Sequence, residues 1–371
     1  MLYREMGKTG ELVSVLGFGC MRLPIIDGKS NIIDEKKAVE MIEYAVEHGI
    51  NYFDTAYPYH GSMEGGGASE PFLKKALHNH RNGIKIATKS PTWLINEYSD
   101  FEKYLDIQLE RLGTDYIDFY LLHTLNTRLW TTAKKADYAK FLDNAIKNGK
   151  IKHAGFSFHD NALLFKEIVD SYDWDFCQIQ YNYIDENYQA GKEGLDYAAK
   201  KGLGIVIMEP LRGGSLAKNL PDGVLNVLKK SNPERSAADW ALSWLWNNGD
   251  ISIVLSGMTT MEQLEENIKI AENGLPDSMT EEEVNAINIA KKMYRDKLKV
   301  NCTACGYCMP CPVGVDIPGS FGKYNDYYLF DSESVRNSSI WRYNYHQSGE
   351  KKASNCIECG RCEEHCPQNI P

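Results

Sequence analysis

Eight short apolar segments divide the first 275 residues, and longer amphipathic stretches separate them. Each segment has the length and composition of a buried β-strand, and the stretches between have the spacing of helices that bury one face. Seven intervening helices and a last one at about residues 260–273 predict an α/β fold, a closed (β/α)8 TIM barrel over residues 1–275. The eight segments are Val15–Cys20, Asn51–Asp54, Ile84–Thr88, Ile117–Leu122, Ile151–Gly155, Phe176–Gln180, Gly204–Met208 and Ile251–Leu255.

An open, doubly wound α/β sheet is the alternative fold for the same alternation. Such a sheet would carry a glycine-rich phosphate-binding turn directly after its first strand. Here Gly17 and Gly19 have no third glycine behind them, and no helix opens at this point. The barrel is therefore the predicted fold.

Side-chain caps mark four of the expected helices. Asp34 can cap the first of them. Ser99 has the capping-box spacing with the glutamate three residues later, which predicts a helix start. Asn232 precedes a proline and predicts another start. Thr280 again has capping-box spacing, and its helix lies in residues 276–300, a segment expected to link the barrel to the C-terminal region.

Two short runs near the C-terminus hold eight of the ten cysteines, and a proline follows each run. A backbone that wraps a cubane cluster can direct a sulfur inward at every third residue, and the closing Cys-Pro is typical of bacterial ferredoxins, whose fourth cysteine binds the other cluster. The first run departs from that pattern, because its last gap is one residue shorter. By this rule one [4Fe–4S] cluster would be bound by Cys302, Cys305, Cys308 and Cys366. The second would be bound by Cys356, Cys359, Cys362 and Cys311.

Zinc and disulfides are the alternatives for these cysteines. Structural zinc usually takes two Cys-x-x-Cys pairs separated by a loop, without a third evenly spaced cysteine. Cysteines this close along the chain cannot all form disulfides, and nothing marks the chain as secreted. Two [4Fe–4S] clusters are therefore the expected cofactors of residues 301–371, a small, mostly α-helical, ferredoxin-like domain.

Composition and charge narrow the class of protein. The chain is 43% hydrophobic and 25% charged, as in soluble globular proteins. Its net charge of −10 argues against a nucleic-acid partner, since phosphate binding needs clustered Lys and Arg. The opening residues are polar, and no apolar run is long enough to span a membrane. We therefore expect a cytoplasmic protein that binds neither nucleic acid nor membrane.

Four ionisable side chains of different types follow three consecutive strands. Asp54 ends the second strand, and Tyr59 comes five residues later. Lys89 ends the third strand and His123 ends the fourth, so all four are expected at the C-terminal mouth of the barrel, where active sites form. A phenol is a poor acid at neutral pH unless a nearby cation lowers its pKa, and Lys89 would be that cation. Tyr57 is an equally placed alternative to Tyr59.

Several segments at these strand ends resemble the aldo-keto reductase family, in order and at family-like spacing. They are Phe53-Asp54-Thr55-Ala56 with Tyr59, Ala87-Thr88-Lys89, Leu121-Leu122-His123, Gly155-Phe156-Ser157, Gln178-Ile179-Gln180-Tyr181-Asn182 and Glu265-Glu266-Asn267. The resemblance extends to a subset of this family that carries a C-terminal domain with two ferredoxin-type motifs.

The resemblance implies a catalytic tetrad and a mechanism. Asp54, Tyr59, Lys89 and His123 fall on the tetrad positions. Hydride would pass from C4 of a nicotinamide to a carbonyl carbon while Tyr59 donates the proton. Lys89 would lower the pKa of Tyr59, Asp54 would position Lys89, and His123 would orient the substrate oxygen.

Further residues are expected to bind the nucleotide. The family positions that bind the nicotinamide amide are Ser157 and Gln178, and the loop after strand seven offers backbone N–H groups and one Arg to the pyrophosphate, unless it is only a mobile loop. The full set is Ser157, Gln178, Met208, Leu211, Arg212, Gly213, Ser256, Gly257, Met258, Gln263, Glu266 and Asn267.

Two features depart from the family pattern. Met208 occupies the stretch in which the family usually has an aromatic that stacks on the nicotinamide, and Glu209 beside it is unexpected except as a partner of Arg212. The loop at residues 255–263 has no Lys or Arg for the 2′-phosphate of NADPH, which favours NADH.

Two function hypotheses remain open. One is an NAD(P)H-dependent reductase of a small aldehyde or ketone, with clusters that exchange electrons with the barrel or a redox protein partner. The other is an electron-transfer or redox-sensing protein that binds nucleotide or flavin without carbonyl turnover. Hydride moves two electrons together and a cluster moves one, so direct coupling would need a carrier such as a flavin, for which no motif stands out. The complete tetrad favours the enzyme, whose substrate loops would be residues 58–67, 92–98 and 125–130.

Overall fold

The computed structural model of the protein describes residues 1–218, 220–302, 308–330, 332–347, 349–366 and 369–371. The chain forms two compact units, each assembled from several segments. The first unit contains Met1–Tyr181, Ala190–Pro210 and Leu245–Ser278. The second contains Asn182–Gln189, Leu211–Trp244 and Met279–Pro371.

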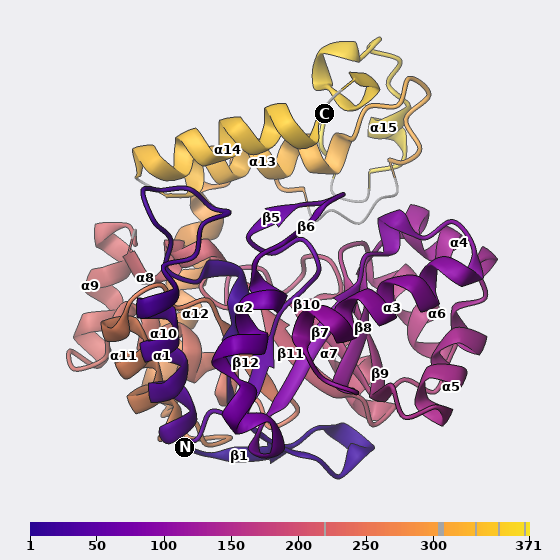
Figure 1. Ribbon diagram of the computed structural model, residues 1–371. Helices are drawn as coiled ribbons and strands as arrows, with labels where there is room; N and C mark the ends of the chain where they lie inside the picture. Colours follow the sequence, from indigo (N-terminus) through magenta and orange to yellow (C-terminus); the bar gives the residue numbers. More distant parts are fainter. Residues whose placement is uncertain (219, 303–307, 331, 348, 367–368) are drawn as a thin grey trace. The chain divides into compact units, whose positions relative to one another are not determined.

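A closed barrel of eight parallel strands forms the first unit, in the order β10-β11-β12-β3-β4-β7-β8-β9, which confirms the predicted fold (Figure 1). Closure pairs the first barrel strand with the last, with Ser256 opposite Phe18. Buried side chains such as Phe119, Leu121 and Phe176 form one core cluster here. The strands are β3 (Leu16–Gly19), β4 (Tyr52–Asp54), β7 (Lys85–Ser90), β8 (Ile117–Leu125), β9 (Ile151–Phe158), β10 (Phe176–Gln180), β11 (Gly204–Met208) and β12 (Ile253–Ser256).

Helices connect these strands, and two small hairpins complete the first unit. The helices are α1 (Glu35–Glu47), α2 (Ser69–Ala76), α3 (Tyr98–Leu112), α4 (Thr127–Lys135), α5 (Tyr138–Lys147), α6 (Ala162–Asp170), α7 (Gly191–Lys200) and α11 (Met261–Ala271). The hairpins pair β1 (Tyr3–Glu5) with β2 (Leu12–Ser14) and β5 (Gly61–Ser62) with β6 (Gly66–Gly67).

The second unit is helical. Its core packs α9 and α10 with α12 and the end of α13 around Trp240, Ile287 and Tyr294. Helix α13 also packs against α14. The helices are α8 (Ser215–Lys218), α9 (Asp222–Ser231), α10 (Ala237–Trp246, whose last two residues belong to the first unit), α12 (Glu281–Lys297), α13 (Ile317–Leu329), α14 (Glu333–His346) and α15 (Arg361–Glu364).

Two of the four predicted helix starts are wrong, whereas the cap at Asp34, which starts α1, is confirmed. Helix α3 has its capping box at Glu97 and Asp100, because the chain is still extended at Glu97 and turns helical at Tyr98, so the cap lies two residues before Ser99. Asn232 ends α9, and the N–H of Asp239 near the start of α10 instead bonds the hydroxyl of Ser236. The capping box at Thr280 is confirmed.

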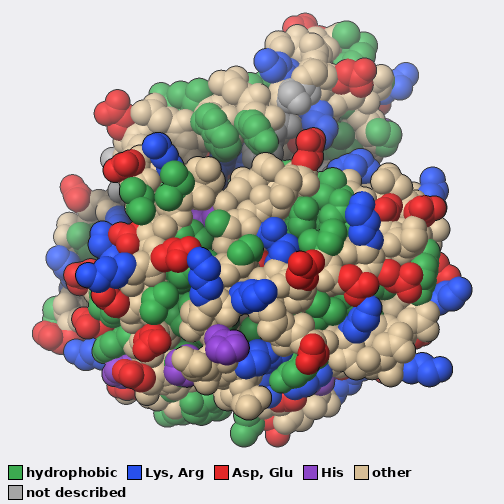
Figure 2. Space-filling view, in the orientation of Figure 1, with side chains coloured by type: hydrophobic (Ala, Val, Ile, Leu, Met, Phe, Trp, Pro, Cys, Tyr) green, Lys and Arg blue, Asp and Glu red, His purple; other side chains and the backbone are tan. Residues whose placement is uncertain are grey.

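Charged side chains of both signs lie on the face of the molecule shown in Figure 2. On the face shown in Figure 2, acidic and basic side chains are interspersed, so the net charge of −10 is not gathered there in one patch. Within the described residues, none of the helices has both the length and the apolar character that crossing a bilayer requires.

Candidate active site and cluster-binding region

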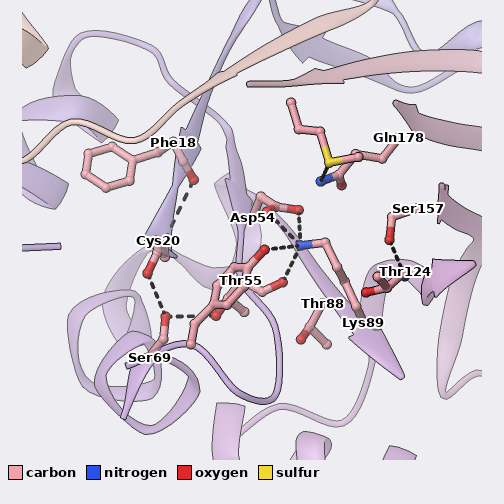
Figure 3. Close-up of polar contacts among 12 residues, drawn as sticks. Phe18, Cys20, Asp54, Thr55, Ser69, Thr88, Lys89, Thr124, Ser157 and Gln178 are labelled. Carbon is pink, nitrogen blue, oxygen red and sulfur yellow. Dashed lines mark hydrogen bonds and ion pairs between the residues drawn. The ribbon is translucent and has the colours of Figure 1, made fainter. Parts of the chain in front are cut away.

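A buried ion pair forms the centre of the barrel mouth. Lys89 at the end of β7 donates from Nζ to both carboxylate oxygens of Asp54 at 2.7 Å, and to the carbonyl of Thr55 at 2.7 Å (Figure 3). Lys89 is fully buried and Asp54 is 3% exposed. Burial alone would lower the pKa of Lys89, but Asp54 and Tyr59 outweigh burial and raise it. Lys89 therefore carries its positive charge at neutral pH.

Tyr59 lies beside this ion pair. Its phenol oxygen is 3.5 Å from Lys89 Nζ. Burial raises the pKa of Tyr59, and Lys89 offsets the rise only in part. The net direction is opposite to the lowering that we expected from sequence, because desolvation of a phenolate outweighs one neighbouring charge. The alternative, Tyr57, packs edge-on against Tyr104 with the guanidinium of Arg111 over its ring.

His123 stands across from Tyr59. The two ring centres are 6.2 Å apart at 77°, and the Trp93 ring lies 5.3 Å from His123 on another side. Burial lowers the pKa of His123 well below its usual value, and Lys89 lowers it further, so the imidazole is neutral at neutral pH. Its Nδ1 is buried without a hydrogen-bond partner among the described residues.

A buried hydrogen-bond network supports Lys89 from behind. Gln108 of α3 donates to the carbonyl of Lys89 at 3.0 Å and to Glu70 at 2.7 Å. Tyr120 donates to the amide oxygen of Gln108 at 2.8 Å, and Arg111 pairs with Glu70 at 2.7 Å. Since each of these buried polar groups has a partner, the network fixes the backbone that carries the lysine.

Ser157 and Gln178 are adjacent in the sheet, because the β9–β10 register places them opposite each other. The amide nitrogen of Gln178 contacts Met208 Sδ at 3.7 Å, and its buried Oε1 has no partner among the described residues. Ser157 Oγ accepts the N–H of Thr124 at 2.7 Å, which leaves its own proton to donate (Figure 3). One orphaned acceptor and one spare donor fit the carboxamide of a nicotinamide, which has an N–H₂ group and a carbonyl.

The loop after β12 is held by its own side chains. The buried Asn267 of α11 donates to Ser256 at 2.9 Å, and Gln263 accepts the N–H of Thr259 at 2.9 Å. Gly257 is exposed, as is the predicted Glu266, whereas Met258 is buried. Their contact with a nucleotide stays a prediction.

Arg212, in the loop that follows β11, is paired inside the second unit. It donates from Nε to Asp185 at 3.1 Å and from Nη2 to Asp326 of α13 at 2.7 Å. Burial opposes its charge, but these carboxylates raise the pKa of Arg212. The neighbouring Leu211 packs against the core of the second unit, and Gly213 has φ +66°. A role for these three residues in pyrophosphate binding stays a prediction.

The two cysteine runs meet at one cavity in the second unit. This cavity has a volume of about 710 Å³. Among the described residues, no three Cys, His, Asp or Glu side chains converge as a site for a single metal ion. Cysteines spread over the wall of a large cavity suit polynuclear clusters better than one zinc ion. The predicted ligands that line it are Cys308, Cys311, Cys356, Cys359 and Cys362.

Three predicted ligands lie outside this set. Cys302 and Cys366 are partly exposed and are not among the lining residues. Cys305 lies outside the described residues, as does Pro367, the proline that closes the second run.

Comparison with known proteins settles the family. The sequence model of the aldo/keto reductase family matches residues 15–289. The chain belongs to this family. A second model, described as a 4Fe-4S dicluster domain, matches residues 301–370. This C-terminal match supports iron–sulfur clusters over zinc as the ligand of the cysteine runs.

Two characterised relatives cover most of the aldo/keto reductase region. L-glyceraldehyde 3-phosphate reductase of Escherichia coli (strain K12) is 27% identical over 321 residues, covering 74% of this chain and 88% of the relative. L-galactose dehydrogenase of Arabidopsis thaliana is 29% identical over 292 residues, covering 71% and 86%. The holo form of aldo-keto reductase AKR11C1 from Bacillus halodurans has a TM-score of 0.64 at 26% identity, covering 78% of this chain and 96% of that one.

Sequence reasoning missed three side chains at the mouth of this aldo/keto reductase barrel. Arg22 pairs with Glu209 at 3.8 Å, and a Cβ added to Gly257 would lie 3.0 Å from its side chain. His60 accepts the N–H of Leu23 at 3.2 Å. His60 and Trp93, which flanks His123, lie in residues 58–67 and 92–98, two segments predicted to line the substrate pocket, but neither residue was assigned a role of its own. Nothing in the sequence signals Arg22, since only barrel closure brings β3 beside β12.

Proposed function

We propose that the chain is an NAD(P)H-dependent reductase of a small aldehyde or ketone. The observation that carries this proposal is the position of Lys89 Nζ, 2.7 Å from both oxygens of Asp54 and 3.5 Å from the Tyr59 phenol. The arrangement gives a buried phenol a fixed cationic neighbour, as a general acid at a developing alkoxide requires. Relatives named as a reductase and a dehydrogenase of sugar derivatives support the same chemistry.

The side chains of the mouth divide the proton chemistry among them. The raised pKa of Tyr59 keeps its phenol protonated at neutral pH, and Lys89 stabilises the phenolate once the proton has moved to the substrate oxygen. Asp54 holds Lys89 in its charged form. The neutral His123 orients the substrate oxygen beside the phenol by hydrogen bonding.

The nucleotide would bind next to these groups. Ser157 donates to the carbonyl of the nicotinamide amide, Gln178 accepts from its N–H₂ group, and Met208 packs on the ring through its sulfur. Bound NAD(P)H would supply a hydride to the carbonyl carbon, and bound [4Fe–4S] clusters would supply single electrons. NADH is the preferred form, because residues 255–263 contain no Lys or Arg for a 2′-phosphate and Arg22, which lies beside Gly257, already pairs with Glu209.

The cysteine runs would bind two clusters, and these clusters would pass their electrons to a separate redox protein. A hydride carries two electrons at once, so the cluster reactions and the carbonyl reduction need not share one step. We assign residues 1–275 to the barrel, 276–300 to a linking helix and 301–371 to the cluster domain.

The test compares Tyr59→Phe with Tyr57→Phe in the anaerobically purified protein. Tyr59→Phe removes only the proton donor and should lower carbonyl reduction by about 10²- to 10⁴-fold, the usual contribution of a general acid. The dissociation constants of NADH and NADPH, measured by fluorescence titration, should stay at their wild-type values, with NADH the tighter. Tyr57→Phe removes the same hydroxyl two residues away and should retain activity. Full activity in Tyr59→Phe would overturn the proposal.

A further inference from the structure

Strand β8 carries one extra residue at the point where His123 reaches the barrel mouth. Leu122 pairs with Phe156 and Leu125 pairs with Phe158, with a register shift between the two pairs. Two residues of β8 therefore face a single residue of β9, Ser157. This is the geometry of a β-bulge, a device that redirects a side chain next to an active site.

The second bulge residue has a strained backbone. Thr124 has φ +58°, in the left-handed region that β-branched residues rarely adopt. Such a conformation is energetically unfavourable and persists only when its surroundings impose it. The bulge is therefore held by specific contacts and not by backbone preference.

Two buried hydroxyls make these contacts. Thr92 Oγ1 accepts the N–H of His123 at 3.0 Å. Ser157 Oγ accepts the N–H of Thr124 at 2.7 Å, as Figure 3 shows. Thr92 is fully buried, and its own hydroxyl donates to the carbonyl of Ser90 at 3.3 Å. Both backbone N–H groups at the bulge thus find side-chain acceptors, one from the short turn that follows β7 and one from β9.

The bulge decides where the imidazole lies. Phe119 and Leu121 belong to the core cluster of the barrel, so the two-residue alternation of a strand puts His123 on the same inner side. The extra residue shifts the register after His123, so that Leu125 pairs with Phe158 while His123 stays on the inner side of the barrel. Since Nδ1 of His123 has no partner among the described residues, that atom does not anchor the ring, and the backbone and neighbouring rings must.

We propose that Thr92 is a positioning residue, whose hydroxyl holds the β-bulge that directs His123 at the substrate oxygen. This proposal rests on the carbonyl reduction proposed above. Ser157 joins the bulge to the nucleotide pocket, because the hydroxyl that accepts from Thr124 is also the donor assigned to the nicotinamide amide. The orientation of the His123 imidazole therefore depends on the same strand ends that would bind the nucleotide.

The test removes the hydroxyl of Thr92 and keeps the branched shape of its side chain. Thr92→Val removes the hydroxyl that accepts from His123 and should lower kcat/KM for the carbonyl by about three- to tenfold, the worth of one hydrogen bond. The dissociation constant of NADH should stay unchanged, and Thr92→Ser, which keeps a hydroxyl, should restore kcat/KM. Thr131→Val is the matched control, since the Thr131 hydroxyl only donates to a carbonyl of the exposed face of α4.

Amide hydrogen exchange at His123 separates this proposal from the reaction itself. Exchange at the His123 amide should be faster in Thr92→Val than in the wild type. If the valine variant does not fold, Thr92→Ala should show the same increase. Wild-type exchange or wild-type kcat/KM in these variants would overturn the positioning role. Absence of carbonyl reduction in the unmodified protein would instead overturn the proposed function, and the exchange rates would still report whether Thr92 holds the bulge.

Discussion

The ammonium of Lys89 contacts both carboxylate oxygens of Asp54 at the same distance, 2.7 Å, in a site that solvent does not reach. A symmetric, buried pair of this kind is stable only while both partners keep their charge. The pair therefore fixes the charge state of the barrel mouth before any ligand arrives.

Asp54→Asn should leave a buried ammonium without its counter-ion. Breaking a buried pair costs about 3–5 kcal/mol, so the melting temperature should fall markedly, and carbonyl reduction should fall with the loss of charge on Lys89. Asp196→Asn is the matched control, because it breaks an exposed pair with Lys192 on α7 that is worth less than about 1 kcal/mol. Equal shifts in the two variants, measured by thermal melting followed by circular dichroism, would contradict a structural role of the buried pair.

The order of strands and the positions of Asp54, Lys89 and His123 could be predicted because consecutive parallel strands end at the same rim. Local apolar runs and strand-end residues carry that information. The net direction of the Tyr59 pKa could not be predicted in this way. It depends on how deeply the phenol is buried, which the neighbouring sequence does not state.

Contacts made by distant segments were also beyond sequence reasoning. Glu209, which follows β11, pairs with Arg22 of the first βα loop, since barrel closure places β11 and β3 on either side of β12. Arg212 has carboxylate partners 27 and 114 residues away along the chain. No periodicity or cap signal links positions so far apart, so only the packed chain identifies these partners.

His60 should make stability depend on pH. Its ring accepts from Leu23 and contacts the carbonyl of Ser30 at 2.8 Å through Nδ1, which fits the neutral form. Burial lowers the pKa of His60. The folded chain then binds fewer protons than the unfolded chain between the folded pKa and about 6.5, so this stabilisation is present above about pH 6.5 and is lost as pH falls.

His60→Asn tests this dependence, since asparagine tolerates the φ of +60° at this position but does not titrate. The wild-type protein should melt at a higher temperature than the variant at pH 8, and the difference should shrink at pH 5. His123 is present in both proteins, so its own titration cancels in the difference. A difference that stays constant or grows on acidification would show that His60 does not titrate in this way.

Each cluster should take three cysteines from one run and the fourth from the other run. By the ferredoxin rule Cys311 shares a cluster with Cys356, although it lies in the other run, and Cys366 belongs to the first cluster. The double variant Cys311→Ser/Cys356→Ser removes two ligands of one cluster and should therefore lose only half of the iron. The double variant Cys311→Ser/Cys366→Ser removes one ligand of each cluster and should lose nearly all of it. Iron analysis and the electron paramagnetic resonance signal of the dithionite-reduced protein measure the loss. Cys177→Ser, at a fully buried barrel position, should keep the full iron content. Loss of nearly all of the iron in both double variants would instead mean that each run binds its own cluster. The shortened gap before Cys311 would then be the reason, because it changes where that sulfur can reach.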